Sequence, residues 1–317
     1  MLMKPNYSVA FLFFSRYNTT YIKRDELVFS LVGKIMNRII KTILNIVLSI
    51  LLILCAVMLF RSFSENAESK KDYDEAMVLA GSRDAEEPET STVYEMGTPQ
   101  ETEPESTHSQ LPESAPMPDD PNIIQLLELD LTQLREENED VVGWITIPDT
   151  TVSYPLLQWT DNQFYLNHTW KQTKNANGSI FIEYRNSPDF TDFNTIIYGH
   201  NMQSGAMFGS LRKYKDETYW QEHPAFYIVC DQGVLRYDIF AIHNAGVDTI
   251  IYGLELETER TRTEFIRFAT DYSSIDTGIT PTIDDKIVTL STCTGQGYAT
   301  RWVVQGVLNK AGSYMFE

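Results

Sequence analysis

The chain has 317 residues, enough for two ordinary domains, and its apolar residues are spread unevenly along it. Its formal net charge of -19 argues against a nucleic-acid partner, because phosphate backbones bind clustered basic side chains and repel an acidic chain. The cysteines, Cys55, Cys230 and Cys293, are too few and too scattered for a disulfide framework or for a Cys-x-x-Cys zinc site. No nucleotide-binding or metal-binding motif occurs, so we expect no cofactor and no metal.

Residues 42–60, TILNIVLSILLILCAVMLF, contain no charged side chain. As a helix rising 1.5 Å per residue, this stretch crosses most of the roughly 30 Å hydrocarbon core of a bilayer. Lys34, Arg38 and Lys41 precede it, and the positive-inside rule predicts a cytoplasmic N-terminus and an extracellular remainder. A cleaved signal peptide usually has a shorter apolar core that ends in small residues, whereas this one ends Met58-Leu59-Phe60-Arg61. We therefore predict an uncleaved, single-pass membrane anchor.

The regions on either side of the anchor differ in character. Residues 1–41 are predicted to be cytoplasmic, and because residues 1–35 fit neither an ordered domain nor a targeting signal, we expect translation to begin at Met36. Residues 61–121 contain 16 acidic and 4 basic side chains and are rich in Ser, Thr and Pro. Such a segment buries too little apolar surface to fold, so we predict a disordered acidic linker. The folded domain is predicted to span residues 122–317.

The domain is predicted to be mainly β. It begins with one amphipathic helix, because apolar side chains recur at helical spacing from Ile123 to Leu134, and helical insertions are predicted at 207–215 and 256–270. Short β-type runs are separated by turn signals. These predicted strands are 141–148, 152–157, 179–184, 194–198, 225–230, 235–243, 286–292 and 301–308. Eight short strands in about 175 residues predict a closed or nearly closed β-barrel.

Three of the predicted strands carry polar residues with complementary chemistry at their ends. Cys293 ends one apolar run, His200 follows another just after Gly199, and Arg301 opens the last strand eight residues after Cys293. Taken singly, each has a plain structural interpretation: a small buried hydrophobe, a surface histidine and a strand-edge charge. A hairpin-like connection would bring Cys293 and Arg301 together.

The other cysteines and histidines lack this context. Cys55 lies in the apolar stretch and Cys230 inside the run FYIVC, so both are predicted to be packing residues. His108 belongs to the acidic linker, and the remaining histidines are predicted to lie on the surface or in the core; these are His168, His223 and His243.

Two motifs, TLSTC followed by Arg301 at the start of the last strand and the upstream YGHN, resemble the sortases, which are cysteine transpeptidases of Gram-positive surfaces. The resemblance covers about residues 122–317. Residues 138–145, 161–168 and 178–182 and the long insertion before the cysteine strand are similar to class B in particular. The connection TGQGYAT between Cys293 and Arg301 departs from this pattern by being short.

The resemblance implies a closed, eight-stranded sortase-type barrel with an N-terminal helix. It implies that Cys293 attacks a threonine carbonyl in the C-terminal sorting signal of a surface protein, forming a thioacyl intermediate. An amine of a peptidoglycan precursor then resolves this intermediate, so that the protein becomes anchored to the cell wall.

The same resemblance assigns roles around the nucleophile. His200 is expected to act first as acid and then as base, and Arg301 to stabilise the reacting carbonyl with its permanently charged guanidinium. The residues next to them are further candidates for contacts with the peptide; these are Tyr198, Asn201, Ser291 and Thr292.

Three alternatives stay open on the sequence alone. A pilus-polymerising sortase would use a pilin lysine as acceptor, a hydrolytic cysteine peptidase would use water, and a non-catalytic surface module would leave Cys293 inert.

Overall fold

The structure is a computed structural model that describes residues 8–81, 119–293 and 299–316. The chain forms two compact units, residues 1–64 and residues 65–317. Residues 82–118, the greater part of the predicted linker, and residues 294–298, most of the Cys293–Arg301 connection, lie outside the described residues.

A single helix, α1 (Ser8–Leu79), forms the described part of the first unit and continues into the second. It is the one described helix that is long and apolar enough to cross a membrane, with an 18-residue window of mean hydropathy 3.0 and no buried residue in that window. The prediction that residues 61–121 are disordered is wrong for residues 61–79, which are helical. Here Ser69, Tyr73 and Ala76 lie on one helix face and are buried in the second unit.

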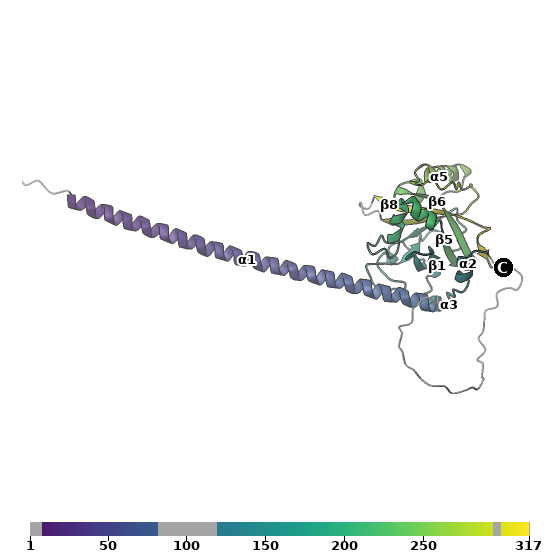
Figure 1. The fold of residues 1–317 in the computed structure, drawn as a ribbon, viewed down its shortest axis with the longest axis horizontal. Coiled ribbons are helices and arrows are strands. Elements are labelled where there is room, and N and C mark those ends of the chain that lie inside the picture. Colours follow the sequence, from purple (N-terminus) through teal and green to yellow (C-terminus); the bar gives the residue numbers. More distant parts are fainter. Residues whose placement is uncertain (1–7, 82–118, 294–298, 317) are drawn as a thin grey trace, which may run out of the picture. The chain divides into compact units, whose positions relative to one another are not determined.

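The second unit is a β-barrel (Figure 1). Its eight strands pair in the order β5-β1-β2-β3-β4-β7-β8-β6, and β6 pairs back with β5 to close the ring. The closed eight-stranded barrel predicted from the sequence is confirmed. The strands are β1 (Val141–Thr146), β2 (Ser153–Leu157), β3 (Ile180–Ile182), β4 (Asn194–Tyr198), β5 (Ala225–Cys230), β6 (Gly233–Gly246), β7 (Ile287–Cys293) and β8 (Thr300–Leu308).

Two pairings in the ring are parallel, β2 with β3 and β4 with β7, and the others are antiparallel. Gly143 allows β1 and β5 to approach closely, because a Cβ at this position would lie only 2.6 Å from the Val229 carbonyl oxygen. A ninth strand, β9 (Tyr314–Met315), pairs with β6 at its Gly233 end and was not predicted. Its two residues are too few to show a period-two pattern.

Short helices connect the strands, and one longer helix precedes β7. The single helix predicted near Ile123–Leu134 is two helices, because the chain turns between them at residues 127–131. The insertion predicted at 207–215 is a 3₁₀ helix followed by a short α-helix. The helical elements of the second unit are α2 (Pro121–Leu126), α3 (Thr132–Glu137), η1 (Phe164–Leu166), η2 (Gly209–Lys215), α4 (Glu217–Glu222), η3 (Ile250–Tyr252) and α5 (Glu259–Asp271).

Helix α5 covers a second hydrophobic cluster outside the barrel interior. Its N-terminus is closed by a capping box in which the Thr258 and Thr261 side chains bond reciprocally to backbone and hydroxyl groups. Phe265 and Ile266 pack from α5 onto Phe240 of β6 and Val303 of β8. This packing fixes the outer faces of the strands that lead to the predicted site.

Candidate active site

The predicted site residues lie at the adjoining ends of three neighbouring strands. In the parallel pair β4–β7, Tyr198 is opposite Ser291, and the Gly199 amide donates to the Ser291 carbonyl at 3.2 Å. His200 follows Tyr198 by two residues, just beyond the end of β4, and Cys293 follows Ser291 by two residues, at the end of β7. In the antiparallel pair β7–β8, Cys293 is directly opposite Arg301. Because neighbouring strands lie about 4.8 Å apart, the backbones of all three residues meet at one edge of the barrel wall.

The imidazole of His200 is partly exposed and is held by a backbone carbonyl. Its Nε2 lies 2.7 Å from the carbonyl oxygen of Leu166 in η1. A carbonyl oxygen has no proton to donate, so Nε2 must carry the hydrogen. The His200 carbonyl in turn accepts from the Phe208 amide at 3.0 Å, which fixes the backbone after β4. The ring is therefore oriented before any substrate binds.

Arg301 is half-buried in β8, between β7 on one side and β6 on the other, where it is opposite Ala245. Its Nη1 donates to the Thr300 carbonyl at 3.2 Å. Cys293 is the last residue of β7, at the position where the strand pairing with β8 begins. The Arg301 guanidinium stays charged and offers several hydrogen-bond donors in a fixed geometry.

A cluster around the buried carboxylate of Glu183 lies beside this edge and was missed from the sequence. Glu183 follows β3, is 1% exposed and accepts from Asn162 Nδ2 at 2.6 Å and from the Tyr198 hydroxyl at 3.1 Å. Arg185 Nε lies 2.7 Å from its other oxygen. Burial and the Glu183 charge raise the pKa of Tyr198 well above its usual value, so Tyr198 remains a neutral donor. A buried glutamate inside an apolar run, as in IFIEY, is the sequence signal that could have identified this cluster.

The other predicted contact residues differ in exposure. Ser291 and Thr292 are buried, and the Ser291 hydroxyl lies 2.8 Å from the Tyr252 hydroxyl of η3. Neither offers exposed surface to a peptide in the described structure. Tyr198 and Asn201 are half-buried, and Asn201 bridges to Met207. Tyr252 was not predicted as a site residue. Its hydrogen bond connects the insertion between β6 and β7 with the cysteine strand β7.

The remaining cysteines and histidines have other roles. Burial raises the pKa of the Cys230 thiol to about 11, and its Sγ lies 3.1 Å from Gln232 Oε1, so this cysteine is not a reactive thiolate. His243 is buried, and His168 stacks on Phe164 with ring centroids 4.1 Å apart. Within the described ranges, no group of three or more His, Cys, Asp or Glu side chains is placed to hold a metal ion.

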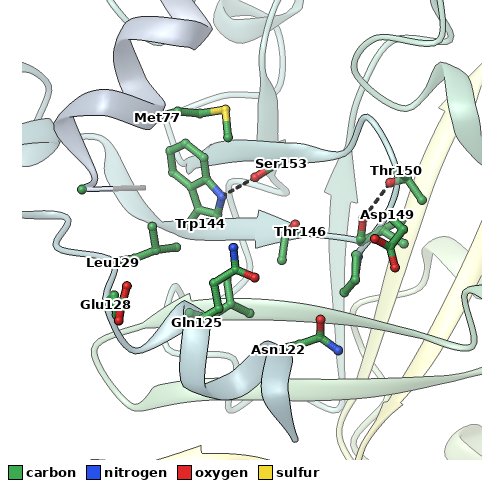
Figure 2. A pocket seen from close by; sticks show the side chains of 14 residues that line it. Met77, Asn122, Gln125, Glu128, Leu129, Trp144, Thr146, Asp149, Thr150 and Ser153 are labelled. Carbon is green, nitrogen blue, oxygen red and sulfur yellow. Dashed lines mark hydrogen bonds between the residues drawn. The ribbon is translucent and has the colours of Figure 1, made fainter. Parts of the chain in front are cut away.

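Several hollows lie in the described part of the second unit. One, of 340 Å³, lies between the end of α1, α2 and β1, where Trp144 donates to the Ser153 hydroxyl (Figure 2). None of the predicted site residues lines it. Another, of 480 Å³, is lined by Arg185, Ile250, residues 253–257 and Thr261, and so lies beside the Glu183 cluster.

Comparison with known proteins identifies the family of this chain. The model of the sortase domain matches residues 145–309, which include His200, Cys293 and Arg301. This match covers more than half of the chain, and the chain belongs to the sortase family of cysteine transpeptidases.

Its relatives within the family are of class B. Sortase B of Listeria monocytogenes is 41% identical over 185 residues, which cover 56% of this chain and 74% of the relative. Sortase B from Bacillus anthracis in complex with AAEK1 is 29% identical, with a TM-score of 0.58, and the match covers 78% of this chain and 98% of that one. The Staphylococcus aureus sortase B-substrate complex is also 29% identical, with a TM-score of 0.53 over 56% of this chain and 83% of that one. The predicted class B resemblance is confirmed.

Proposed function

We propose that this sortase is anchored in the cell membrane by α1 and joins surface proteins to an amine of the cell wall through Cys293, His200 and Arg301. The observation that carries the proposal is the strand register, which aligns Cys293 with Arg301 across β7–β8 and pairs Tyr198 with Ser291 across β4–β7, two residues before His200 and Cys293 respectively. The similar sortase B of Staphylococcus aureus is described as a complex with its substrate.

In the first half-reaction, the Cys293 thiolate attacks the carbonyl carbon of a threonine in the C-terminal sorting signal. The carbonyl oxygen becomes an oxyanion, which Arg301 stabilises with its guanidinium. His200 donates a proton to the leaving amine as the peptide bond breaks, and a thioester with Cys293 forms. Because the Nε2–H of His200 is bonded to the Leu166 carbonyl, Nδ1 is the ring nitrogen that exchanges protons with the amines.

In the second half-reaction, the amine of a peptidoglycan precursor attacks the thioester carbon. His200 accepts the proton that this amine loses, the new amide forms and the Cys293 thiolate is released. The histidine therefore returns to its starting protonation state, and no external oxidant or reductant is needed. Class B relatives favour wall anchoring over pilus polymerisation, in which a pilin lysine would be the acceptor.

The membrane part of the proposal rests on α1, whose apolar window has a mean hydropathy of 3.0. Basic residues precede residues 42–60, and by the positive-inside rule they support a cytoplasmic N-terminus and a barrel outside the cell. Alkaline carbonate extraction of cell membranes is expected to leave the full chain in the membrane fraction and to release a chain that lacks residues 42–60. Release of the full chain would contradict the anchor.

A transpeptidation assay tests the reaction. The full chain in detergent micelles is incubated with a library of threonine-containing sorting peptides and a soluble amine, and products are identified by mass. Cys293→Ala is expected to give neither thioester nor amide, and Arg301→Lys to lower kcat by about 10²–10³, the usual loss for one oxyanion donor. Arg236→Lys is the matched control, because Arg236 pairs with Asp120 and Asp238 in a separate network.

The products separate the alternatives. Amide formation supports a transpeptidase, whereas the free acid alone would favour a hydrolytic cysteine peptidase. Amide product from Cys293→Ala would overturn the assignment of the nucleophile.

A further inference from the structure

We propose that Tyr73, on the part of α1 that enters the second unit, is a positioning residue for His200. It acts through the loop of residues 164–179, which carries the Leu166 carbonyl. The inference rests on the proposed catalytic role of His200 and adds a residue from outside the matched sortase domain, which begins at residue 145.

Tyr73 is 6% exposed and makes its polar contacts with the end of the 164–179 loop. Its hydroxyl donates to the Gly178 carbonyl at 2.9 Å and lies 2.9 Å from the Ser179 hydroxyl, which donates to the His168 carbonyl at 2.8 Å. The Tyr73 ring packs edge-on against Tyr154 of β2, with centroids 5.1 Å apart. The hydroxyl is thus fixed from the barrel side and holds Gly178 and Ser179 in place.

Gly178 transmits this restraint to Leu166. It has φ +58°, and a Cβ added to it would lie 2.7 Å from the Leu166 carbonyl oxygen and 2.6 Å from that of Tyr165. The Ser179 amide also donates to the Tyr165 carbonyl at 2.9 Å. The backbone that Tyr73 holds is therefore in direct contact with the peptide group whose oxygen accepts from His200 Nε2 at 2.7 Å.

Further contacts bind the same loop to α1 at several points. Trp170, fully buried, donates its indole N–H to the Asp72 carbonyl at 2.7 Å. Lys171 pairs with Glu75 at 2.6 Å, and Asn175 donates to the Glu65 carbonyl at 2.9 Å. The helix and the loop are consequently packed together. Among these contacts, the one made by the Tyr73 hydroxyl is the contact with Gly178 itself.

The test compares two buried tyrosines in the full chain in detergent micelles. Tyr73→Phe keeps the ring and removes the hydroxyl that holds Gly178. Tyr227→Phe is the matched control, because Tyr227 is 3% exposed and its hydroxyl donates to Asp120 at 2.7 Å, in a network that does not include the 164–179 loop. Turnover of a sorting peptide gives kcat and KM, and ¹⁵N NMR of labelled histidine reports the His200 Nε2 resonance.

Tyr73→Phe is expected to lower kcat about tenfold, to leave KM within about twofold and to move the His200 Nε2 resonance, because orientation of a reacting group acts on the chemical step. Tyr227→Phe is expected to lower the unfolding midpoint comparably while leaving kcat and the resonance unchanged. Gly178→Ala, which forces the Leu166 carbonyl to shift, is expected to reproduce the loss of kcat.

An unchanged kcat and resonance in Tyr73→Phe would overturn the inference, whatever its effect on stability. Equal losses of kcat in Tyr73→Phe and Tyr227→Phe would also overturn it, since general destabilisation would then explain both. His200→Ala separates the two proposals: if it retains wild-type turnover, the catalytic role of His200 fails, whereas an inactive His200→Ala with an unaffected Tyr73→Phe rejects only the positioning role.

Discussion

At the scale of single residues, Glu183 is a buried carboxylate whose partners come from three separate segments. Glu183→Ala would leave Asn162 and the Tyr198 hydroxyl without their acceptor. A buried polar group without a partner costs about 1–3 kcal/mol, so we expect a loss of this order in the free energy of unfolding. Urea denaturation followed by tryptophan fluorescence measures it, because all five tryptophans lie in the second unit.

Glu264→Ala provides the comparison for Glu183→Ala. Glu264 also pairs with an arginine, Arg260 at 3.0 Å, but on the exposed face of α5, where side-chain exposures are 48% and 86%. An exposed pair of this spacing contributes about 0.3–0.5 kcal/mol. Equal losses from the two substitutions would show that burial of Glu183 has no energetic consequence.

The sequence predicted which residues lie at the adjoining strand ends but not which backbone groups orient their side chains. His200, Cys293 and Arg301 stood out because each is a reactive or charged residue at the end of an apolar run. The acceptor for His200 is the carbonyl of Leu166, and a carbonyl belongs to every residue type, so no letter of the sequence marks it. Only the fold, which brings η1 to the end of β4, reveals that contact.

At the scale of elements, buried polar side chains join four adjacent strands beneath the site. His243 Nε2 of β6 lies 3.0 Å from Gln305 Oε1 of β8, and Gln305 Nε2 donates to the Thr289 hydroxyl of β7 at 2.9 Å. Thr289 in turn donates to Asn194 of β4 at 2.7 Å. Each of these hydrogen bonds replaces one that the buried group would make with water. The strands that lead to the three site residues are therefore joined by one row of hydrogen bonds.

This row makes the stability of the barrel depend on pH. Burial lowers the pKa of His243 below its ordinary value of 6.5, so the folded chain keeps it neutral while the unfolded chain takes up a proton below that pH. The free energy of unfolding should therefore fall as the pH drops below 6.5, by at most about 1.4 kcal/mol per pH unit for one proton. His243→Gln should remove this component in urea titrations between pH 7.5 and 5.5. An identical pH slope in the variant would contradict the prediction.

Strands were more predictable than helices in this chain. All eight barrel strands were predicted, because each presents a run of β-branched and aromatic residues between turn signals. The last turns of α1 were missed, because the face that packs on the barrel consists of Ser69, Tyr73, Ala76 and Ala80, which carry little hydrophobic signal among many acidic residues. Their burial depends on a docking surface that is remote in sequence, so local composition pointed to disorder.

At the scale of the whole molecule, the second unit begins at Glu65 rather than at the predicted residue 122. Residues 65–81 and the rest of the unit are separated in sequence by residues 82–118, yet Tyr73, Ala76 and Ala80 belong to the same hydrophobic cluster as Trp144 and Leu290. A chain of residues 65–317 should consequently fold with its core complete, whereas a chain of residues 119–317 lacks one side of it.

Removal of residues 65–81 is expected to cost about 3–7.5 kcal/mol in the free energy of unfolding. Burial of the Tyr73 ring contributes about 1.5–3 kcal/mol, and the hydrogen bonds to Gly178, Trp170 and Asn175 about 0.5–1.5 kcal/mol each. The shorter chain should unfold at a lower urea concentration and turn over sorting peptides more slowly. A chain of residues 65–317 with Lys171→Ala is the control. It loses the partly exposed pairs with Glu75 and Glu137 and the contact with the Trp170 ring, and it should stay within about 1 kcal/mol of the parent. Equal urea midpoints for residues 65–317 and 119–317 would show that the end of α1 does not belong to the folded domain. The domain would then begin at residue 119 or later.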